Sequence, residues 1–74
     1  MPKLPTLSNK EVVKVLTKTG FYIHHQKGSH IAMRRNGPPP NRIVVPSHKE
    51  LKKGMLRAII KQSGLSVEEF VKLL

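Results

Sequence analysis

Cysteine and aspartate are both absent from the 74 residues of the sequence. Without cysteine the chain has no disulfide, no thiolate metal site and no cysteine nucleophile. Its only carboxylate side chains are those of Glu11, Glu50, Glu68 and Glu69. A magnesium-dependent nuclease needs clustered carboxylates for its hard cation, whereas the adjacent pair near the C-terminus is better explained by helix capping. We therefore expect no metal ion, and a chain this short leaves no room to enclose a large cofactor, so we expect no cofactor.

Long apolar runs are also missing. No run approaches the length of a membrane span, and residues 1–10 lack the apolar core of a signal peptide. The expected location is the cytoplasm, without a membrane partner.

Positive charge is what the chain has in excess. Fourteen Lys and Arg residues against four acidic residues give a formal net charge of +10. Self-repulsion at this density is a cost that a small domain seldom carries without a polyanionic partner. Nucleic acid is the first candidate partner, ahead of an anionic membrane surface and an acidic protein.

The chain is long enough for one domain with a modest core, which we assign to residues 1–74. Residues 1–7 contain two prolines and are expected to form an extended lead-in. Ser8 followed by Glu11 matches a capping box, and Gly20 stands where a left-handed C-terminal cap belongs, so a helix is expected between them. Its predicted apolar stripe is Val12, Val13, Val15 and Leu16, with Lys10, Lys14 and Lys18 on one exposed face.

After Gly20 the apolar period changes to two, which predicts a three-stranded antiparallel meander. The strands are expected at residues 21–26, 29–35 and 42–46, with a tight turn at Lys27-Gly28. Strict alternation in the first strand would place Phe21, Ile23 and His25 on one face and Tyr22, His24 and Gln26 on the other. In the later strands the predicted core residues are Ile31, Met33, Ile43 and Val45, which leaves His30, Ala32 and Arg34 on the opposite face.

Two further helices are predicted after the strands. Ser47 and Glu50 form a candidate capping pair, although Gly54 interrupts the pattern and the main helix is expected to start near it and to end at Gly64. Its predicted stripe is Leu56, Ile59 and Ile60, helped by Met55, while Lys53, Arg57 and Lys61 make a second basic row. Ser66 and Glu69 predict a last short helix that buries Val67, Phe70, Val71 and Leu74. The expected fold is α+β, in the order α-β-β-β-α with a short terminal helix, and the helices on one face would leave the other face of the sheet open to a ligand.

His30 is the sharpest candidate for chemistry among the four histidines. Histidine is the natural group for proton transfer near neutral pH in a chain without Cys or Asp. His30 follows Gly28 and Ser29 at a tight turn, where backbone amides can hold an anion. His24 and His48 are weaker candidates for contact with RNA, and a zinc site made from His24, His30 and His48 lacks the close ligand spacing of such sites.

Four segments, in this order and spacing, resemble the HicA family, the small ribonuclease toxins of HicAB toxin–antitoxin systems. They are Gly28-Ser29-His30, Val45-Pro46-Ser47-His48, Leu51-Lys52-Lys53-Gly54 and Ile59-Ile60-Lys61-Gln62-Ser63-Gly64-Leu65-Ser66. The resemblance covers nearly the whole chain, and only the proline-rich connection Pro38–Pro40 is less typical. It implies a fold like that of double-stranded RNA-binding domains, a single catalytic histidine, here His30, and a HicB-type antitoxin protein that blocks the active site.

RNA carries its own nucleophile, the ribose 2′-hydroxyl, so the enzyme needs only a base, an acid and stabilisation of the phosphate. The hypothesis is metal-independent cleavage of mRNA in which His30 acts as base or acid, Gly28 and Ser29 hold the phosphate, and Lys27 and Arg34 add positive charge. The basic row Lys53, Arg57 and Lys61 would follow an RNA backbone. Two alternatives remain open: a non-catalytic RNA-binding module of the same fold, and a basic adaptor whose partner is an acidic protein.

Overall fold

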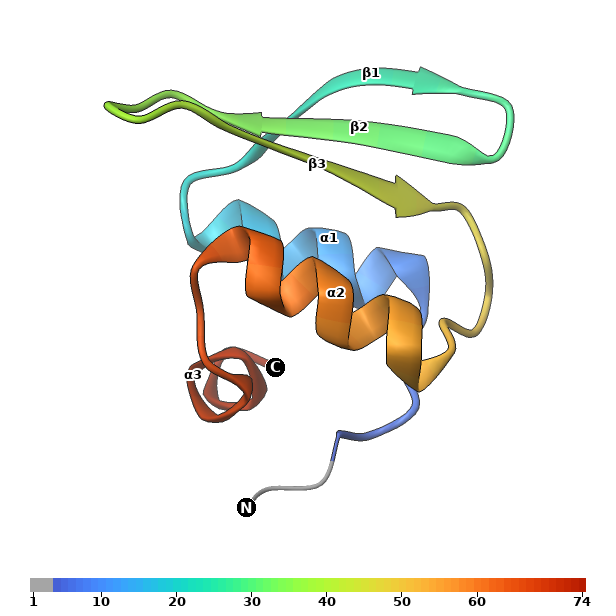
Figure 1. Cartoon of the computed structure of the whole chain (residues 1–74). Helices are drawn as coiled ribbons and strands as arrows, with labels where there is room; N and C mark the ends of the chain where they lie inside the picture. The colour runs from blue at the N-terminus through green and yellow to red at the C-terminus, as the bar shows by residue number, and fades with distance from the viewer. Residues whose placement is uncertain (1–3) are drawn as a thin grey trace.

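The structure, a computed structural model, describes residues 4–74, so the first three residues of the predicted lead-in lie outside the described residues. The elements in chain order are α1 (Asn9–Lys18), β1 (Tyr22–Lys27), β2 (His30–Arg35), β3 (Asn41–Pro46), α2 (Lys53–Ser63) and α3 (Val67–Lys72). The strands form one antiparallel sheet in the order β1-β2-β3. The helices α1 and α2 lie on one face of this sheet, with α3 beyond α2 (Figure 1). The predicted α+β class, element order and layering are confirmed.

Local signals define the ends of α1 as expected. The Ser8 hydroxyl accepts a hydrogen bond from the Glu11 amide, and the Glu11 carboxylate accepts one from the Ser8 amide, which completes the capping box. After the helix, Gly20 has a φ of 98°, the left-handed conformation that its position predicted. The chain can therefore turn directly from α1 into the sheet.

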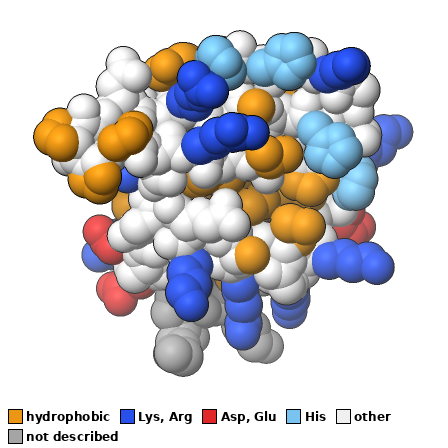
Figure 2. All heavy atoms as spheres, turned by 45° about the horizontal axis from the view of Figure 1, so that its top comes forward, with side chains coloured by type: hydrophobic (Ala, Val, Ile, Leu, Met, Phe, Trp, Pro, Cys, Tyr) orange, Lys and Arg blue, Asp and Glu red, His pale blue; other side chains and the backbone are white. Residues whose placement is uncertain are grey.

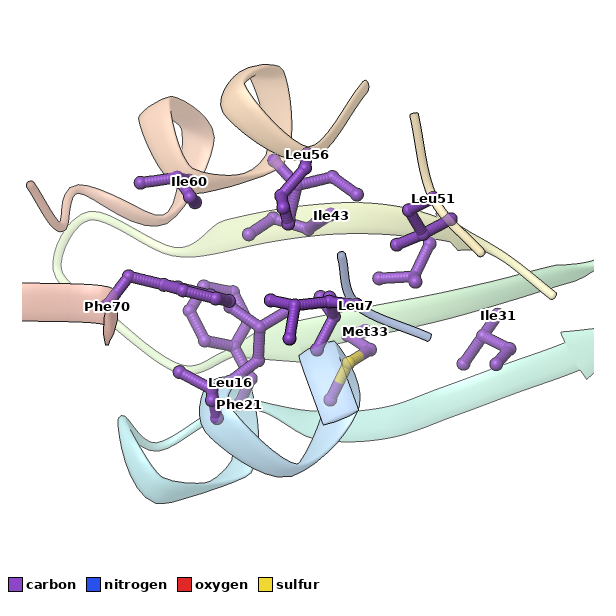
Figure 3. Close-up of a cluster of buried hydrophobic side chains, with 14 of the residues drawn as sticks. Leu7, Leu16, Phe21, Ile31, Met33, Ile43, Leu51, Leu56, Ile60 and Phe70 are labelled. Atoms are coloured by element: carbon purple, nitrogen blue, oxygen red, sulfur yellow. The ribbon is translucent and has the colours of Figure 1, made fainter. Parts of the chain in front are cut away.

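The helices, β2, β3 and the segments that flank them contribute to one apolar core between the sheet and the helices (Figure 3), whereas all six residues of β1 are exposed. The predicted stripes are buried, including Leu16 on α1, Met33 on β2, Leu56 on α2 and Phe70 on α3. The buried hydrophobic residues are Leu4, Leu7, Val12, Val15, Leu16, Phe21, Ile31, Met33, Ile43, Val45, Leu51, Leu56, Ile59, Ile60 and Phe70.

The lead-in contributes more than the sequence indicated. Leu4 and Leu7 are buried, and Leu7 forms an isolated antiparallel bridge with Leu51, whose amide donates to the Leu7 carbonyl over 2.8 Å. This bridge fixes Leu51 against the lead-in, directly after a bend at Lys49 and Glu50. Ser47 and Glu50 consequently do not cap a helix, and α2 begins at Lys53 without a side-chain cap.

Two predicted core residues are exposed. Met55 is 46% exposed and Leu74 is 48% exposed, so both assignments were wrong. Met55 lies in the first turn of α2, where the buried side is set by Leu56, Ile59 and Ile60. Leu74 follows the end of α3, and the half-buried Leu73 packs against the core in its place.

The pairing register separates the two faces of the sheet. On β2, Ile31 and Met33 are buried and pair with Val45 and Ile43 of β3. Alternation places the other β2 residues and their β3 partners on the face away from the helices, which we call the open face. These residues are His30 with Pro46, Ala32 with Val44, and Arg34 with Arg42.

A capping box also begins α3, and it supports a stability prediction. The Ser66 hydroxyl accepts from the Glu69 amide over 3.0 Å, and the Ser66 amide donates to the Glu69 carboxylate over 2.9 Å. Ser66→Ala should lower the free energy of unfolding by about 1 kcal/mol, which is about 4–8 °C in melting temperature for a domain of this size. Ser66→Asn retains a capping group, so its free energy of unfolding should fall far less. Equal decreases in the two variants would contradict a capping role.

The same hydrogen bonds, from the backbone and then the side chain of Ser66, hold the pKa of Glu69 below its usual value of 4.5. A carboxyl with a lowered pKa in the folded state stabilises the fold above its unfolded pKa, and the effect is lost as the pH falls through the folded value. Glu69→Gln should therefore destabilise the protein at neutral pH and lose this effect in acid. Thermal melts of both proteins across pH 2–7 would measure the difference, and a constant difference would contradict the assignment.

Candidate active site

The hairpin between β1 and β2 positions His30. The last pair of the ladder joins Lys27 to His30, so the connecting turn contains only Gly28 and Ser29. Two-residue hairpin turns of the favoured types require a positive φ at their first central residue, and Gly28 has a φ of 57°. No atom lies within 4 Å of a Cβ added to Gly28, so the backbone conformation and not space favours glycine. This turn places His30 at the start of β2, on the open face.

The backbone around His30 is held from both sides. Lys27 pairs with it from β1 and Pro46 from β3. The Ser47 amide donates to the Ser29 carbonyl over 2.7 Å, which extends the β2–β3 contact as far as the turn. The His30 side chain is exposed, with its Nδ1 atom 3.5 Å from the Ser29 hydroxyl oxygen. A substrate can therefore reach an imidazole whose backbone is fixed by two neighbouring strands.

Lysine, arginine and histidine side chains gather on the open face (Figure 2). Lys27 lies directly opposite His30, so these two predicted site residues are brought together with Gly28 and Ser29. Arg34 is on the same strand and face, but four residues along a strand correspond to about 13 Å. Arg34 is therefore placed for a different part of a bound polyanion from the part at His30.

A β-bulge in β1 overturns the predicted alternation of that strand. Ile23 pairs with the buried Met33, whereas His25 pairs with Ala32, because the register shifts between Ile23 and His25. Paired residues share a face, so Ile23 belongs to the helix side and His25 to the open face. The expectation that His25 shares a face with Ile23 was wrong, because a bulge inserts one residue and reverses the phase beyond it.

His25 is a candidate site residue that the sequence interpretation missed. It lies two residues before Lys27, the partner of His30, so it is the diagonal neighbour of His30 across the β1–β2 pair. Such neighbours have Cα atoms about 7–8 Å apart, within reach of long side chains. Nothing in the sequence around His24 indicates the bulge, since neither glycine nor proline occurs there.

The other candidates occupy different surroundings. His24 is exposed and lies at the register shift, and His48 is exposed while its carbonyl accepts from the Asn9 amide over 3.0 Å. The basic row Lys53, Arg57 and Lys61 is exposed on α2, in the helical layer and not on the open face. These residues do not join His30 in one cluster.

The basic side chains of the open face are not neutralised by neighbouring acids in the described part of the chain. Within residues 4–74, the one ion pair joins Lys72 to Glu68 over 3.7 Å, so the basic side chains of the open face have no acidic partner there. No group of three or more His, Cys, Asp or Glu side chains in this part of the chain is placed to hold a metal ion. None of the helices in the described residues combines the length and hydropathy of a membrane span.

One comparison with known proteins identifies a relationship. The family model for the HicA toxin of bacterial toxin-antitoxin systems matches residues 10–65, which include the hairpin turn, all three strands and α2. The search of curated proteins gives no match.

Proposed function

Because the chain belongs to the HicA toxin family of bacterial toxin–antitoxin systems, we propose that it is an endoribonuclease that cleaves mRNA through proton transfer by His30. The observation that carries this proposal is the position of His30, exposed at a two-residue turn on a basic sheet face and paired with Lys27. The reaction takes place in the cytoplasm and needs no metal ion.

The chemistry follows from the substrate. A base takes the proton of a ribose 2′-hydroxyl, whose oxygen attacks the adjacent phosphorus and forms a 2′,3′-cyclic phosphate. The bond to the 5′-oxygen breaks, and an acid returns a proton to that leaving oxygen. Lys27 and the amides of Gly28 and Ser29 stabilise the negative charge that develops on the phosphate.

Two proton transfers suit two side chains. His30 carries out one of them, and His25, its diagonal neighbour on the same face, is the group placed for the other. This arrangement requires no carboxylate, in keeping with the absence of aspartate and the position of the glutamates in the helices and the loop before α2.

The family implies an antitoxin partner. The exposed position of His30 supports one mode of inhibition, in which a HicB-type antitoxin covers the hairpin turn and the open face and excludes RNA from His30. Within residues 4–74 the basic side chains of this face have no acidic partner, which favours an antitoxin segment rich in carboxylates.

The test is incubation of the purified protein with a defined unstructured RNA in the presence of a chelator. Products that end in a cyclic phosphate and a 5′-hydroxyl support the proposal. RNA that is retained but intact would instead favour the second candidate function, a non-catalytic RNA-binding module, which the exposed basic row on α2 also suits.

RNA binding by the basic row on α2 can be tested without measuring cleavage. The row consists of Lys53, Arg57 and Lys61. Each phosphate contact to single-stranded nucleic acid contributes about 0.7 to the slope of log K against log salt concentration. Replacing all three residues with Gln should therefore weaken RNA binding at low salt and flatten this slope by about 2. Fluorescence anisotropy over a salt series measures it, and an unchanged slope would show that the row is only a solvated face.

A further inference from the structure

A second cluster lies on the open face, at the end of the sheet away from His30. Tyr22 of β1 pairs with Arg34 of β2, and Arg34 pairs with Arg42 of β3, so the three side chains form one row across the sheet. All three are exposed. Figure 2 shows basic side chains on this face beside hydrophobic ones.

The two arginines of this row have no internal role in the described structure. Like charges directly opposite each other in a sheet are destabilising, and neither guanidinium has a hydrogen bond or an ion pair within residues 4–74. Arg35, the next residue, shows the contrast: it lies 4.6 Å from the Phe21 ring centroid and donates to the Ser63 carbonyl. Arg35 thus stabilises the fold, whereas the guanidinium N–H donors of Arg34 and Arg42 are exposed to solvent.

Tyr22 adds an aromatic surface to this charge. The residue is 42% exposed, and its hydroxyl lies 3.4 Å from the Asn36 side-chain oxygen, which ties the ring to the loop after β2. Tyr22, Arg34, Asn36 and Arg42 line a shallow hollow of about 310 Å³. An anchored aromatic ring beside guanidinium groups is the combination that binds unpaired bases together with their phosphates.

We propose that Tyr22, Arg34 and Arg42 form a binding subsite for an unpaired nucleotide of RNA, with the base stacked on Tyr22 and a phosphate held between the two arginines. The subsite rests on the proposed function in one respect, since the same strand would be cut at His30, about 13 Å along β2. A base engaged in a duplex is stacked between its neighbours and has no face for Tyr22. The substrate therefore lies across the open face as a single strand.

Binding to an uncleaved RNA tests the subsite without relying on catalysis. In a His30→Ala background, anisotropy would compare a short labelled unstructured RNA with the duplex of the same sequence. Tyr22→Leu should weaken single-strand binding by roughly 5-fold to 100-fold, the usual loss of one stacked base, and leave duplex binding nearly unchanged. The double variant R34Q/R42Q should weaken single-strand binding further, whereas K53Q/R57Q removes the same charge from α2 and should affect both RNAs alike.

The melting temperature distinguishes a role of Arg34 and Arg42 in RNA binding from a role in the stability of the fold. Because R34Q/R42Q removes a repulsive pair, the RNA-free protein should melt at the same temperature or up to a few degrees higher, roughly the value of one cross-strand pair. A lower melting temperature would show that the arginines support the fold. The subsite would be overturned if the Tyr22→Leu variant bound single-stranded RNA as tightly as its parent. It would also be overturned if the variant lost affinity for single-stranded and duplex RNA equally.

The two proposals fail in different ways. If the protein with His30 intact binds single strands through Tyr22 but cuts no RNA, the subsite is supported and the ribonuclease function is wrong. If RNA is cut equally well with and without the Tyr22 side chain, the ribonuclease function is supported and the subsite is wrong.

Discussion

Replacing His30 with alanine should reduce RNA cleavage by about 10²–10⁴-fold, the usual contribution of one placed proton-transfer group. The expected loss is in the chemical step and not in binding, because the positive charge of Lys27 and of the rest of the open face remains. Cleavage of an unstructured RNA in chelator would measure the rate. In bacteria, expression of the wild-type chain should arrest growth, and the variant should not.

Two controls make this result specific. The His30 side chain is exposed and does not belong to the buried core, so the variant should melt like the wild type and bind RNA with similar affinity. His30→Gln, which preserves polarity but transfers no proton, should be as inactive as His30→Ala. Wild-type cleavage rates in either variant would remove His30 from the mechanism.

Replacing His25 with alanine should slow cleavage by about 100-fold, at the lower end of the range for a proton-transfer group. If His25 is the acid, the loss should largely disappear with an RNA in which sulfur replaces the leaving 5′-oxygen, because a thiolate leaves without needing a proton. If His25 is the base, the sulfur substrate should instead restore the His30→Ala variant.

His24→Ala is the matched comparison, since it removes the same side chain one position earlier at the register shift. Any loss from a contact between His24 and RNA should appear in KM and should be the same with the oxygen and sulfur substrates. If neither His25→Ala nor His30→Ala responds to the sulfur substrate, the assignment of two histidines to two proton transfers is wrong.

Signals carried by a few adjacent residues predicted most of the fold. The capping boxes at Ser8 and Ser66 act over three residues, and the glycine caps Gly20 and Gly64 both have positive φ angles, so the helix ends followed from short patterns. The alternation of Ile31 and Met33 likewise predicted which face of β2 carries His30. These local preferences agree with the tertiary packing, which is why they were sufficient.

The remaining features depend on partners distant in the sequence. The burial of Leu4 and Leu7 needs the bridge to Leu51, and no pattern within the lead-in predicts that contact. The bulge in β1 is visible only when Ile23 and His25 are aligned against β2. The position of His25, and with it part of the candidate site, therefore could not be obtained from periodicity alone. The roles of Gly28, Ser29, Lys27, Arg34, His24 and His48 stay predictions.

The core takes side chains from both ends of the described chain, from Leu4 to Phe70. During synthesis, a nascent chain that has reached Ser63 already contains all three strands and two helices, but it still exposes the apolar surface that Phe70 covers. In a domain of this size the missing burial is a large part of the margin of stability. The native sheet is therefore expected to become stable only after α3 has left the ribosome, so the toxin cannot act before this helix has been synthesised.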